Sequence, residues 1–317
     1  LFCGDLSIPN LECSKKLSES MDKIGLFKDQ TVIMNLEGVL LDEQPEESFW
    51  KVYNHKSAIE LRNHCRQLIF GLANNHMYDY PNKIQQMTAM LDNAGIQYFG
   101  LISDSRILPL EFEDNGELYA IFGHCWAIYT RTNPNKVTND RVVDCSYEEF
   151  YKTVTTYMVD NPHRKVIVYF HWNFDFEEHP QPAYKKLAYD LIDFGVEAVI
   201  GNHAHCMQEM ELYRGKPIAY GEGNFYIPGG YFFNGSLSYP EKSHPMYIVS
   251  VNSGLTEMKR GGVEAYLFST DTGGTEAISL KSHETVDTVA TNAVLHVVGD
   301  NDLVDYKKFF QNNRVKR

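Results

Sequence analysis

Short apolar runs, each followed at once by a polar motif, recur along the first 225 residues of the chain. Such runs, when turn residues bound them, are typical of strands that are buried on both faces of a sheet. Between the runs, apolar residues recur at helical spacing, and this spacing predicts amphipathic helices. The alternation of strands and helices indicates an α/β fold with helices on both sides. The predicted helix faces carry Leu17, Met21 and Ile24; Ile84, Met87 and Leu91; and Leu187, Leu191 and Ile192.

Proline and glycine mark the ends of two of these helices. The second helix is expected to begin at Pro81 and to end at Gly95, because proline suits the first turn and glycine suits the left-handed cap. The third helix is expected to run from about Pro182 to Gly195. Asp79 is predicted to cap the helix that begins at Pro81.

The alternation of strands and helices breaks after residue 225. The aromatic-rich segment 226–244 is expected either to contact a substrate or to cover the core, and the sequence leaves both roles open. Strands are predicted over Met246–Val251 and Val263–Ser269, which would extend a sheet.

We expect residues 1–285 to form a single domain, followed by a C-terminal extension over residues 286–317. The extension is polar and ends in basic residues, and its apolar residues could form one face of a helix that docks on the core. These residues are Leu303, Tyr306 and Phe310.

Composition narrows the possible partners and compartments. The formal net charge of −13 argues against a nucleic-acid partner, because phosphate backbones favour a basic face. No apolar stretch approaches the roughly 20 residues of a membrane span. The chain begins with Leu-Phe-Cys, so an upstream signal or anchor could have been removed. The six cysteines show no paired spacing, which predicts free thiols and a cytoplasmic location.

Two histidines flank a single small residue at the end of one predicted strand. His203 and His205 follow the apolar run 198–200, with Ala204 between them. Because side chains at positions i and i+2 of an extended chain point the same way, the two imidazoles can converge on one point. Converging imidazoles are a common metal-ligand arrangement. Taken alone, the motif could equally be a pair of exposed loop histidines.

Five other predicted strands end in polar motifs. Ligands of open α/β sheets bind just beyond the carboxyl ends of the strands, so we expect these motifs to meet at one edge. The motifs supply oxygen and imidazole ligands and no thiolate, which suits one or two divalent ions of Mn, Fe or Zn. A carboxylate placed between two such ions can bridge them. The candidate metal ligands are Asp5, Glu37, Asn75, His171, His203 and His205.

His76 directly follows the candidate ligand Asn75. A histidine beside the metals, but not bound to them, is well placed to protonate a leaving oxygen, so His76 is the candidate general acid. Asn74 is a candidate substrate-binding residue, and its alternative role is to hold the loop by hydrogen bonds. Taken singly, Asp5 could cap a turn and His171 could be a core histidine. Their joint occurrence at strand ends favours an organised site.

The order of these motifs resembles the bacterial capsule-synthesis CapA family, which is linked to poly-γ-glutamate capsules. The resemblance covers roughly residues 1 to 255 and implies the calcineurin-like metallophosphoesterase fold, a four-layer αββα sandwich of two packed sheets. The matching motifs are Gly-Asp at 4–5, Asn-Leu-Glu-Gly at 35–38, Ala-Asn-Asn-His-x-x-Asp at 73–79, His-Trp at 171–172, Gly-Asn-His-Ala-His at 201–205 and Gly-Asn-Phe at 223–225.

The resemblance also implies how the ligands are shared. Asp5 would bind the first metal, and Glu37 would take the bridging position. Asn75 and His171 would bind the second metal, and the histidines of the His-Ala-His motif would divide between the two ions.

The remaining matches would shape the pocket around the metals. His76 would be the acid or transition-state donor, and Trp172 and Asn224 would shape the pocket floor. The chain departs from the pattern at Ser7, where metallophosphoesterases usually carry a histidine, so the first metal site is one imidazole short. Asp175 stands where similar chains often have glutamate, which is a milder change.

We therefore expect a metal-dependent phosphoesterase that acts on a small or glycan-linked phosphorylated metabolite, associated with capsule or poly-γ-glutamate biosynthesis. Two alternatives remain open at this stage. One is a non-catalytic accessory component that binds polymer or partner proteins, and the other is a metal-dependent hydrolase of γ-glutamyl amide bonds. The fold alone does not separate them, because chemistry resides in the site.

Overall fold

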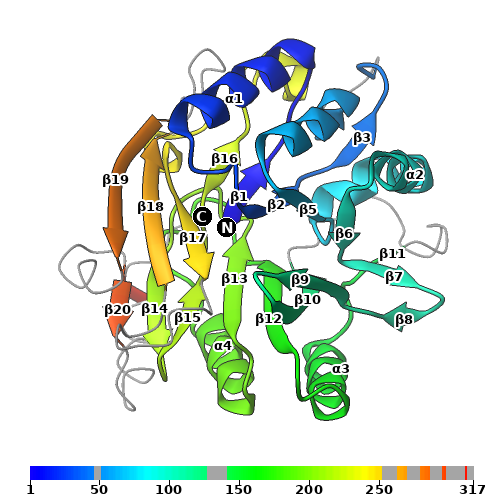
Figure 1. The fold of residues 1–317 in the computed structure, drawn as a ribbon. Coiled ribbons are helices and arrows are strands. Elements are labelled where there is room, and N and C mark those ends of the chain that lie inside the picture. The colour runs from blue at the N-terminus through cyan, green and yellow to red at the C-terminus, as the bar shows by residue number, and fades with distance from the viewer. Residues whose placement is uncertain are drawn as a thin grey trace.

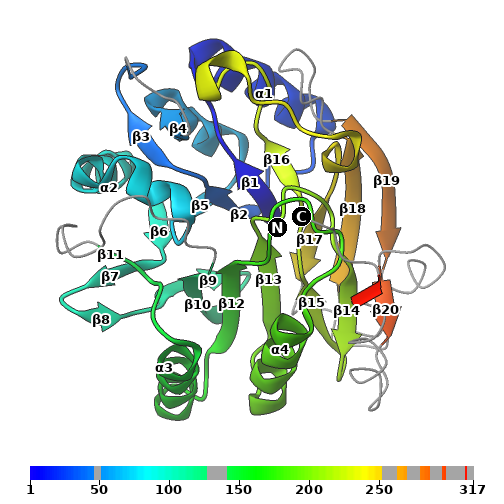
Figure 2. The same cartoon turned by 180° about the vertical axis from the view of Figure 1, so that it is seen from behind.

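The computed structural model of the chain describes residues 1–45, 51–126, 141–251, 263–269, 279–285, 295–297 and 311–312. Within these ranges an eight-stranded and a seven-stranded sheet pack face to face. Helices α1 (Leu11–Ile24) and α2 (Ile84–Ala94) cover the outer face of the first sheet (Figure 1). Helices α3 (Tyr147–Asp160) and α4 (Pro182–Phe194) cover the second, as the view from behind also shows (Figure 2). The fold is α/β with the predicted αββα layers.

The first sheet combines a parallel and an antiparallel half. Its strands are β1 (Phe2–Leu6), β2 (Thr31–Leu36), β5 (Gln67–Gly71), β6 (Gln97–Phe99), β16 (Asn224–Tyr226), β17 (Pro245–Val251), β18 (Val263–Ser269) and β19 (Ser279–Thr285). The order across the sheet is β19-β18-β17-β1-β2-β5-β6, and β16 pairs with β1 off this path. Strands β1, β2, β5 and β6 run parallel, so their carboxyl ends lie along one edge.

The second sheet has the same mixed character. Its strands are β9 (Leu110–Asp114), β10 (Glu117–Cys125), β12 (Lys165–His171), β13 (Ala198–Asn202), β14 (Met210–Tyr213), β15 (Lys216–Ala219) and β20 (Leu295–Val297). The order is β20-β14-β15-β13-β12-β10-β9, and β10, β12, β13 and β15 run parallel. The carboxyl ends of these parallel strands form the second edge of the site.

Smaller elements connect the layers. The short strands are β3 (Val39–Leu41), β4 (Tyr53–His55), β7 (Leu101–Ser103), β8 (Arg106–Ile107) and β11 (Arg141–Val142). The 3₁₀ helices are η1 (Lys56–His64), η2 (Asn75–Asp79), η3 (Pro81–Lys83), η5 (Phe233–Gly235) and η6 (Glu241–Ser243). None of the helices within the described ranges combines the length and the apolar character that a membrane crossing requires.

Alternate residues of the buried strands face different cores. Along β2, Val32 packs toward α1, whereas Ile33 faces the second sheet. Along β12, Val168 packs toward the outer helices, whereas Ile167 and Tyr169 face the first sheet. This is why the parallel strands read as continuous apolar runs in the sequence.

The predicted helix ends agree with the structure apart from one local difference. Gly95 ends α2 and adopts the left-handed conformation, with φ of 68°. Pro81 begins the 3₁₀ helix η3, and α-helical geometry starts at Ile84. Pro182 occupies the first turn of α4, which ends before Gly195. The second predicted helix is therefore tighter in its first turn than expected.

The later part of the chain is described only in segments. Strands β17 and β18 confirm the two strands predicted after residue 244. The apolar residues of the predicted tail helix, 303, 306 and 310, lie outside the described residues, and the division into residues 1–285 and 286–317 stays a prediction. None of the six cysteines, all of which the structure describes, forms a disulfide.

Ile121 tests the packing between the two sheets. Its side chain is fully buried on β10 and contacts the inter-sheet core. Ile121→Ala is expected to lower the free energy of unfolding by about 2–5 kcal/mol, the usual cost of such a cavity. Val159→Ala, at a position on α3 that is 68% exposed, serves as the control and is expected to change it little. Equal effects in urea denaturation would contradict this packing.

Candidate metal centre

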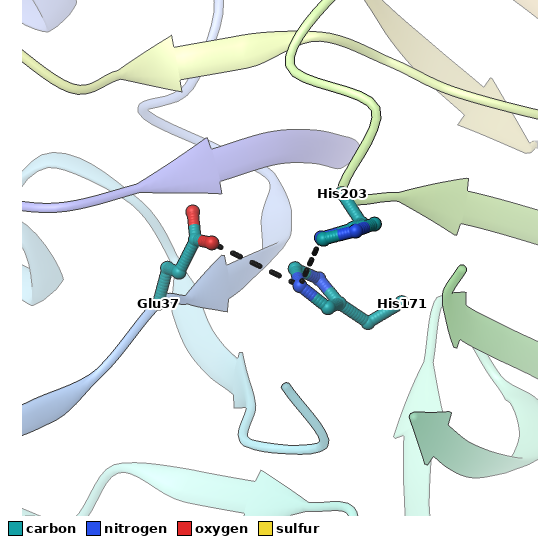
Figure 3. Close-up of side chains that lie close together, drawn as sticks. All are labelled: Glu37, His171 and His203. Carbon is teal, nitrogen blue, oxygen red and sulfur yellow. Dashed lines mark hydrogen bonds and ion pairs between the residues drawn. The ribbon is translucent and has the colours of Figure 1, made fainter. Parts of the chain in front are cut away.

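The predicted ligands meet where the parallel strands of both sheets end. The first sheet supplies Asp5 from β1, Glu37 just after β2 and Asn75 at the start of η2. The second sheet supplies His171, the last residue of β12, and the two histidines that follow β13. Glu37 approaches from one side and His171 and His203 from the other, as Figure 3 shows. In both sheets, therefore, the candidate ligands lie at the carboxyl ends of the parallel strands.

Three candidate ligand atoms surround the Nε2 atom of His171. Asn75 Oδ1 lies 2.7 Å from it. His203 Nδ1 lies 3.1 Å from it and Glu37 Oε1 lies 3.8 Å from it (Figure 3). Ligand atoms of Glu37, His171 and His203 all lie within 4.8 Å of one another, close enough to share one metal ion. We call this group, with Asn75, the second position.

A second group shares the same glutamate. His205 Nε2 lies 3.6 Å from Glu37 Oε1, and His205 Nδ1 lies 3.5 Å from Asp5 Oδ2. Ligand atoms of Asp5, Glu37 and His205 likewise lie within 4.8 Å of one another, and we call this group the first position. Ser7 is fully buried, and its hydroxyl donates to the backbone carbonyl of Glu37 at 3.1 Å. Ser7 thus supports the ligand loop.

Burial dominates the electrostatics of the two carboxylates. Glu37 is 1% exposed, and neither of its oxygens has a hydrogen-bond partner within the described residues. Burial raises the pKa of Glu37 well above its ordinary value and also raises the pKa of Asp5. A buried carboxylate without donors is costly unless a cation lies beside it. These orphaned oxygens therefore fit a divalent metal.

The pKa values of His171 and His205 shift in opposite directions. Burial, together with the neighbouring imidazoles, lowers the pKa of His171 well below its ordinary value, so the ring is neutral and can act as a ligand. Burial also opposes protonation of His205, but Glu37 and Asp5 outweigh it and raise the pKa of His205. In the absence of a metal, a protonated His205 is the nearest counter-ion of these carboxylates.

Two asparagines orient the ligands of the first position. Asn35 Nδ2 donates to Asp5 Oδ1 at 2.7 Å. Asn224 Oδ1 lies 2.8 Å from His205 Nδ1, which favours the neutral ring that carries its proton on Nδ1 and would offer the Nε2 lone pair to a metal. Asn224 is 1% exposed and pairs with Asp5 across β1 and β16. Its observed contact is therefore with a candidate ligand, and substrate contact by Asn224 stays a prediction.

Asn74 holds the loop that carries Glu37. Its Nδ2 donates to the Leu36 carbonyl at 2.8 Å and to Asn35 Oδ1 at 3.2 Å. Its Oδ1 accepts from the Gly38 N–H at 3.2 Å, and the side chain is fully buried. These contacts favour the loop-holding role that the sequence left open, and substrate binding by Asn74 stays a prediction without a contact to support it.

His76 lies beside the metal positions. Its Nε2 is 3.8 Å from Glu37 Oε1, and its Nδ1 is 2.6 Å from Asp79 Oδ2. Asp79 also accepts from the Val52 N–H at 2.8 Å, and η3 has no side-chain cap. The prediction that Asp79 caps a helix is therefore wrong, because its carboxylate pairs with His76. The pairing keeps a proton on Nδ1 and aims Nε2 at the centre.

Trp172 packs away from the metal positions. The ring is fully buried between the second sheet and α4, stacked on Phe170 with ring centroids 4.2 Å apart. Its indole N–H donates to the Tyr220 carbonyl at 2.8 Å. This placement favours a packing role, and nothing in it supports the predicted contact with substrate. Alternation explains the difference, because Trp172 and His171 are neighbours and point to opposite sides.

The backbone that presents the histidines is strained. His203 and His205 have positive φ values of 91° and 51°. A Cβ atom at Gly201 would lie 2.2 Å from the Tyr220 carbonyl oxygen, so only glycine fits there. The His203 N–H donates to Asp5 Oδ2 at 3.1 Å and ties the loop to β1. Such strain is common at functional sites, where surrounding contacts over-determine the geometry.

The segment 226–244 covers the core and also reaches the candidate metal centre, and its contact with a substrate stays a prediction. Phe232 is fully buried and packs edge-on against Tyr53, with ring centroids 5.5 Å apart. Tyr239 lies at the site instead, with its ring centroid 5.3 Å from that of His205. The sequence assigned no role to Tyr239, which lies in none of the motifs, or to Asn35, which opens the Asn-Leu-Glu-Gly motif but contacts Asp5 only through the tertiary fold.

The buried carboxyl of Glu37 makes the stability of the metal-free protein depend on pH. Because burial raises its folded-state pKa, the metal-free folded protein gains stability from this group below the ordinary glutamate pKa and loses it as the pH rises. The side chain of Glu37→Gln stays neutral at every pH. The metal-free variant is therefore expected to have a higher melting temperature than the metal-free wild type at neutral pH, and this difference is expected to shrink in acid. Thermal unfolding across pH measures this, with the exposed Glu113→Gln as control. Parallel pH curves for Glu37→Gln and wild type would contradict it.

Comparisons with known proteins agree on one family. The chain is 26% identical over 171 residues to the "Capsule biosynthesis protein CapA" of Bacillus anthracis, covering 51% of this chain and 41% of that protein. It is 26% identical over 185 residues to a "Probable polyglutamine synthesis accessory protein" of Mycobacterium tuberculosis, covering 54% and 48%. The chain thus matches less than half the length of these relatives.

A solved structure and a family model complete the comparison. A hypothetical protein from Thermus thermophilus superposes with a TM-score of 0.45 at 16% identity, covering 89% of this chain and 98% of that one. A family model described as "Bacterial capsule synthesis protein PGA_cap" matches residues 5–228, which include every predicted ligand. The chain belongs to this bacterial capsule synthesis family.

Proposed function

We propose that the chain is a metal-dependent hydrolase of the phosphoesterase type. The observation that carries the proposal is the placement of Glu37 Oε1, which belongs to both ligand groups and has no hydrogen-bond partner among the described residues. A carboxylate shared by two adjacent ligand sets is what a two-metal hydrolytic centre requires. In the calcineurin-like enzymes that the sequence resembles, such a centre cleaves phosphate esters.

The donor set fits a borderline or hard divalent ion. Asp5 and His205 would hold the first ion, Asn75, His171 and His203 the second, and Glu37 both. Carboxylate, amide and imidazole ligands without thiolate suit Mn, Fe or Zn. When bound, such ions polarise a phosphoryl oxygen and lower the pKa of water.

His76 would supply a proton to the leaving oxygen. Its Nε2 faces the centre, and the contact between Nδ1 and the Asp79 carboxylate orients the ring so that Nε2 can give a proton to the leaving oxygen. The side chain is 17% exposed, so a substrate oxygen can reach it from solvent. His76 is therefore partly exposed, directed at the centre and held in that orientation by Asp79.

The substrate class follows from charge and from the family. Four carboxylates lie at or beside the centre, and the whole chain has a net charge of −13. An anionic substrate would therefore be attracted by the ions themselves. We propose a phosphorylated small molecule or glycan, or a polyglutamate-related substrate, in capsule or polyglutamate assembly, as the names of the matched relatives indicate for those proteins.

A second candidate is an accessory component that keeps the fold and binds polymer. The name of the mycobacterial relative favours it, and Ser7 leaves the first position with three protein ligands. Hydrolysis of γ-glutamyl amides is a third candidate that the same centre could perform. A panel of phosphomonoesters, phosphodiesters and γ-glutamyl peptides, assayed with added Mn²⁺, separates the three by which bond is cleaved, if any.

Metal content tests the proposal directly. The purified chain is expected to bind at least one Mn²⁺ or Zn²⁺ ion, and the second position is expected to fill at lower free metal because it has four ligands. Elemental analysis and calorimetric titration measure both. Protein that contains no metal and takes up none on titration would show that the convergence of these groups has another cause.

Alanine substitutions of His76 and His203 are expected to have different effects on metal content and turnover. His76→Ala should keep its metal and lower turnover by about 10²–10⁴-fold, the usual effect of losing a positioned acid. His203→Ala should lose metal and activity together, because its Nδ1 belongs to the second position. Metal content and turnover are measured on the same samples. If both variants lose metal equally, the roles assigned here are wrong.

A further inference from the structure

The carboxylate of Asp175 faces the metal positions from the exposed side. Its Oδ1 lies 3.5 Å from His203 Nε2, and Asp175, His203 and His205 offer atoms within 4.8 Å of one another. The Asp175 side chain is 44% exposed, whereas Asp5 and Glu37 are buried. None of the roles proposed above uses Asp175.

The two ring nitrogens of His203 face different neighbours. Nδ1 lies 3.1 Å from His171 Nε2, inside the second position, whereas Nε2 lies toward Asp175. A neutral imidazole has one lone pair and one N–H, so a ring that binds an ion through Nδ1 presents a donor at Nε2. Histidine ligands commonly donate that second N–H to a carboxylate, which fixes the ring and strengthens it as a ligand.

The loop that carries Asp175 is tied to the loop that carries the histidines. The Phe176 N–H donates to the Ala204 carbonyl at 2.7 Å, and Asn173 Nδ2 donates to Gln208 Oε1 at 3.0 Å. Asn173 and Phe176, on either side of the Phe174–Asp175 pair, have positive φ values of 72° and 61°. Lys242 Nζ donates a hydrogen bond to the Phe176 carbonyl at 2.6 Å. The position of Asp175 is therefore built into the fold.

We propose that Asp175 is a positioning residue that accepts the Nε2–H of His203 when Nδ1 of the same ring holds the second ion. The inference rests on the metal centre proposed above. Asp175 would strengthen binding at the second position without being a ligand itself. The competing arrangement is a third ion held by Asp175, His203 and His205, in which Nε2 of His203 would have to be a ligand.

Variants that isolate each position test the proposal. In a His205→Ala background, which disables the first position, Asp175→Asn is expected to weaken Mn²⁺ binding by about 10–100-fold, as loss of such a partner usually does. Asp175→Glu is expected to bind more tightly than Asp175→Asn because it keeps a carboxylate. Glu113→Gln, at an exposed position on β9, is the charge-matched control and should bind like its parent.

The reciprocal background gives the second measurement. With His171→Ala, which disables the second position, Asp175→Asn should leave Mn²⁺ affinity at the first position unchanged. Calorimetric titration gives the affinities, and thermal unfolding of the metal-free variants shows whether Asp175→Asn is folded like its parent.

Three results would overturn the inference. They are equal affinities for Asp175→Asn and its parent in the His205→Ala background, equal losses in both backgrounds, and the disappearance of one whole equivalent of ion in Asp175→Asn, which would indicate a third ion. Each leaves the metal centre itself standing. Protein that binds no Mn²⁺ before any substitution would overturn the proposed function along with the inference.

Discussion

The burial of two carboxylates among three imidazoles is the constraint on which this structure depends. Asp5 and Glu37 are almost fully removed from water, and the cost of ionising them there is large unless donors or a cation compensate. Asn35 and the backbone N–H of His203 provide donors for Asp5. The side-chain carboxylate of Glu37 receives no hydrogen bond from any described residue. The fold thus leaves a buried carboxylate uncompensated, and a divalent ion bound beside it would supply the missing positive charge.

Packing, backbone strain and hydrogen bonds in the surrounding structure hold these side chains in place. The two sheets bring their carboxyl edges together over one apolar core, so ligands from distant parts of the sequence become neighbours. Strained φ angles at His203 and His205 aim the imidazoles inward, and Gly201 lets the chain pass close to Tyr220. Asn74 and Ser7 hold the loop that carries Glu37. Stability elsewhere in the core therefore supports a locally unfavourable site.

Local pattern predicted the strands and the convergence of the candidate ligands at one edge, because both depend on short-range regularities. Continuous apolar runs revealed strands buried on both faces, and the polar residues just beyond them were placed by the carboxyl-end rule. Side-chain partners that depend on tertiary contacts were not predictable in this way. Asp79 resembled a helix cap, but the fold brings it to His76, and Trp172 points to the helix side of its strand. The contact between Asp175 and His203 depends on loop geometry that no spacing encodes.

The central claim is that Glu37 lies between two ion positions. Anomalous X-ray diffraction from crystals soaked in Mn²⁺ tests it most directly, because the signal locates the metal independently of the protein atoms. The account predicts a peak among Glu37, Asn75, His171 and His203, and at higher Mn²⁺ a second peak among Asp5, Glu37 and His205. Anomalous peaks elsewhere, with none beside the Glu37 carboxylate, would contradict it.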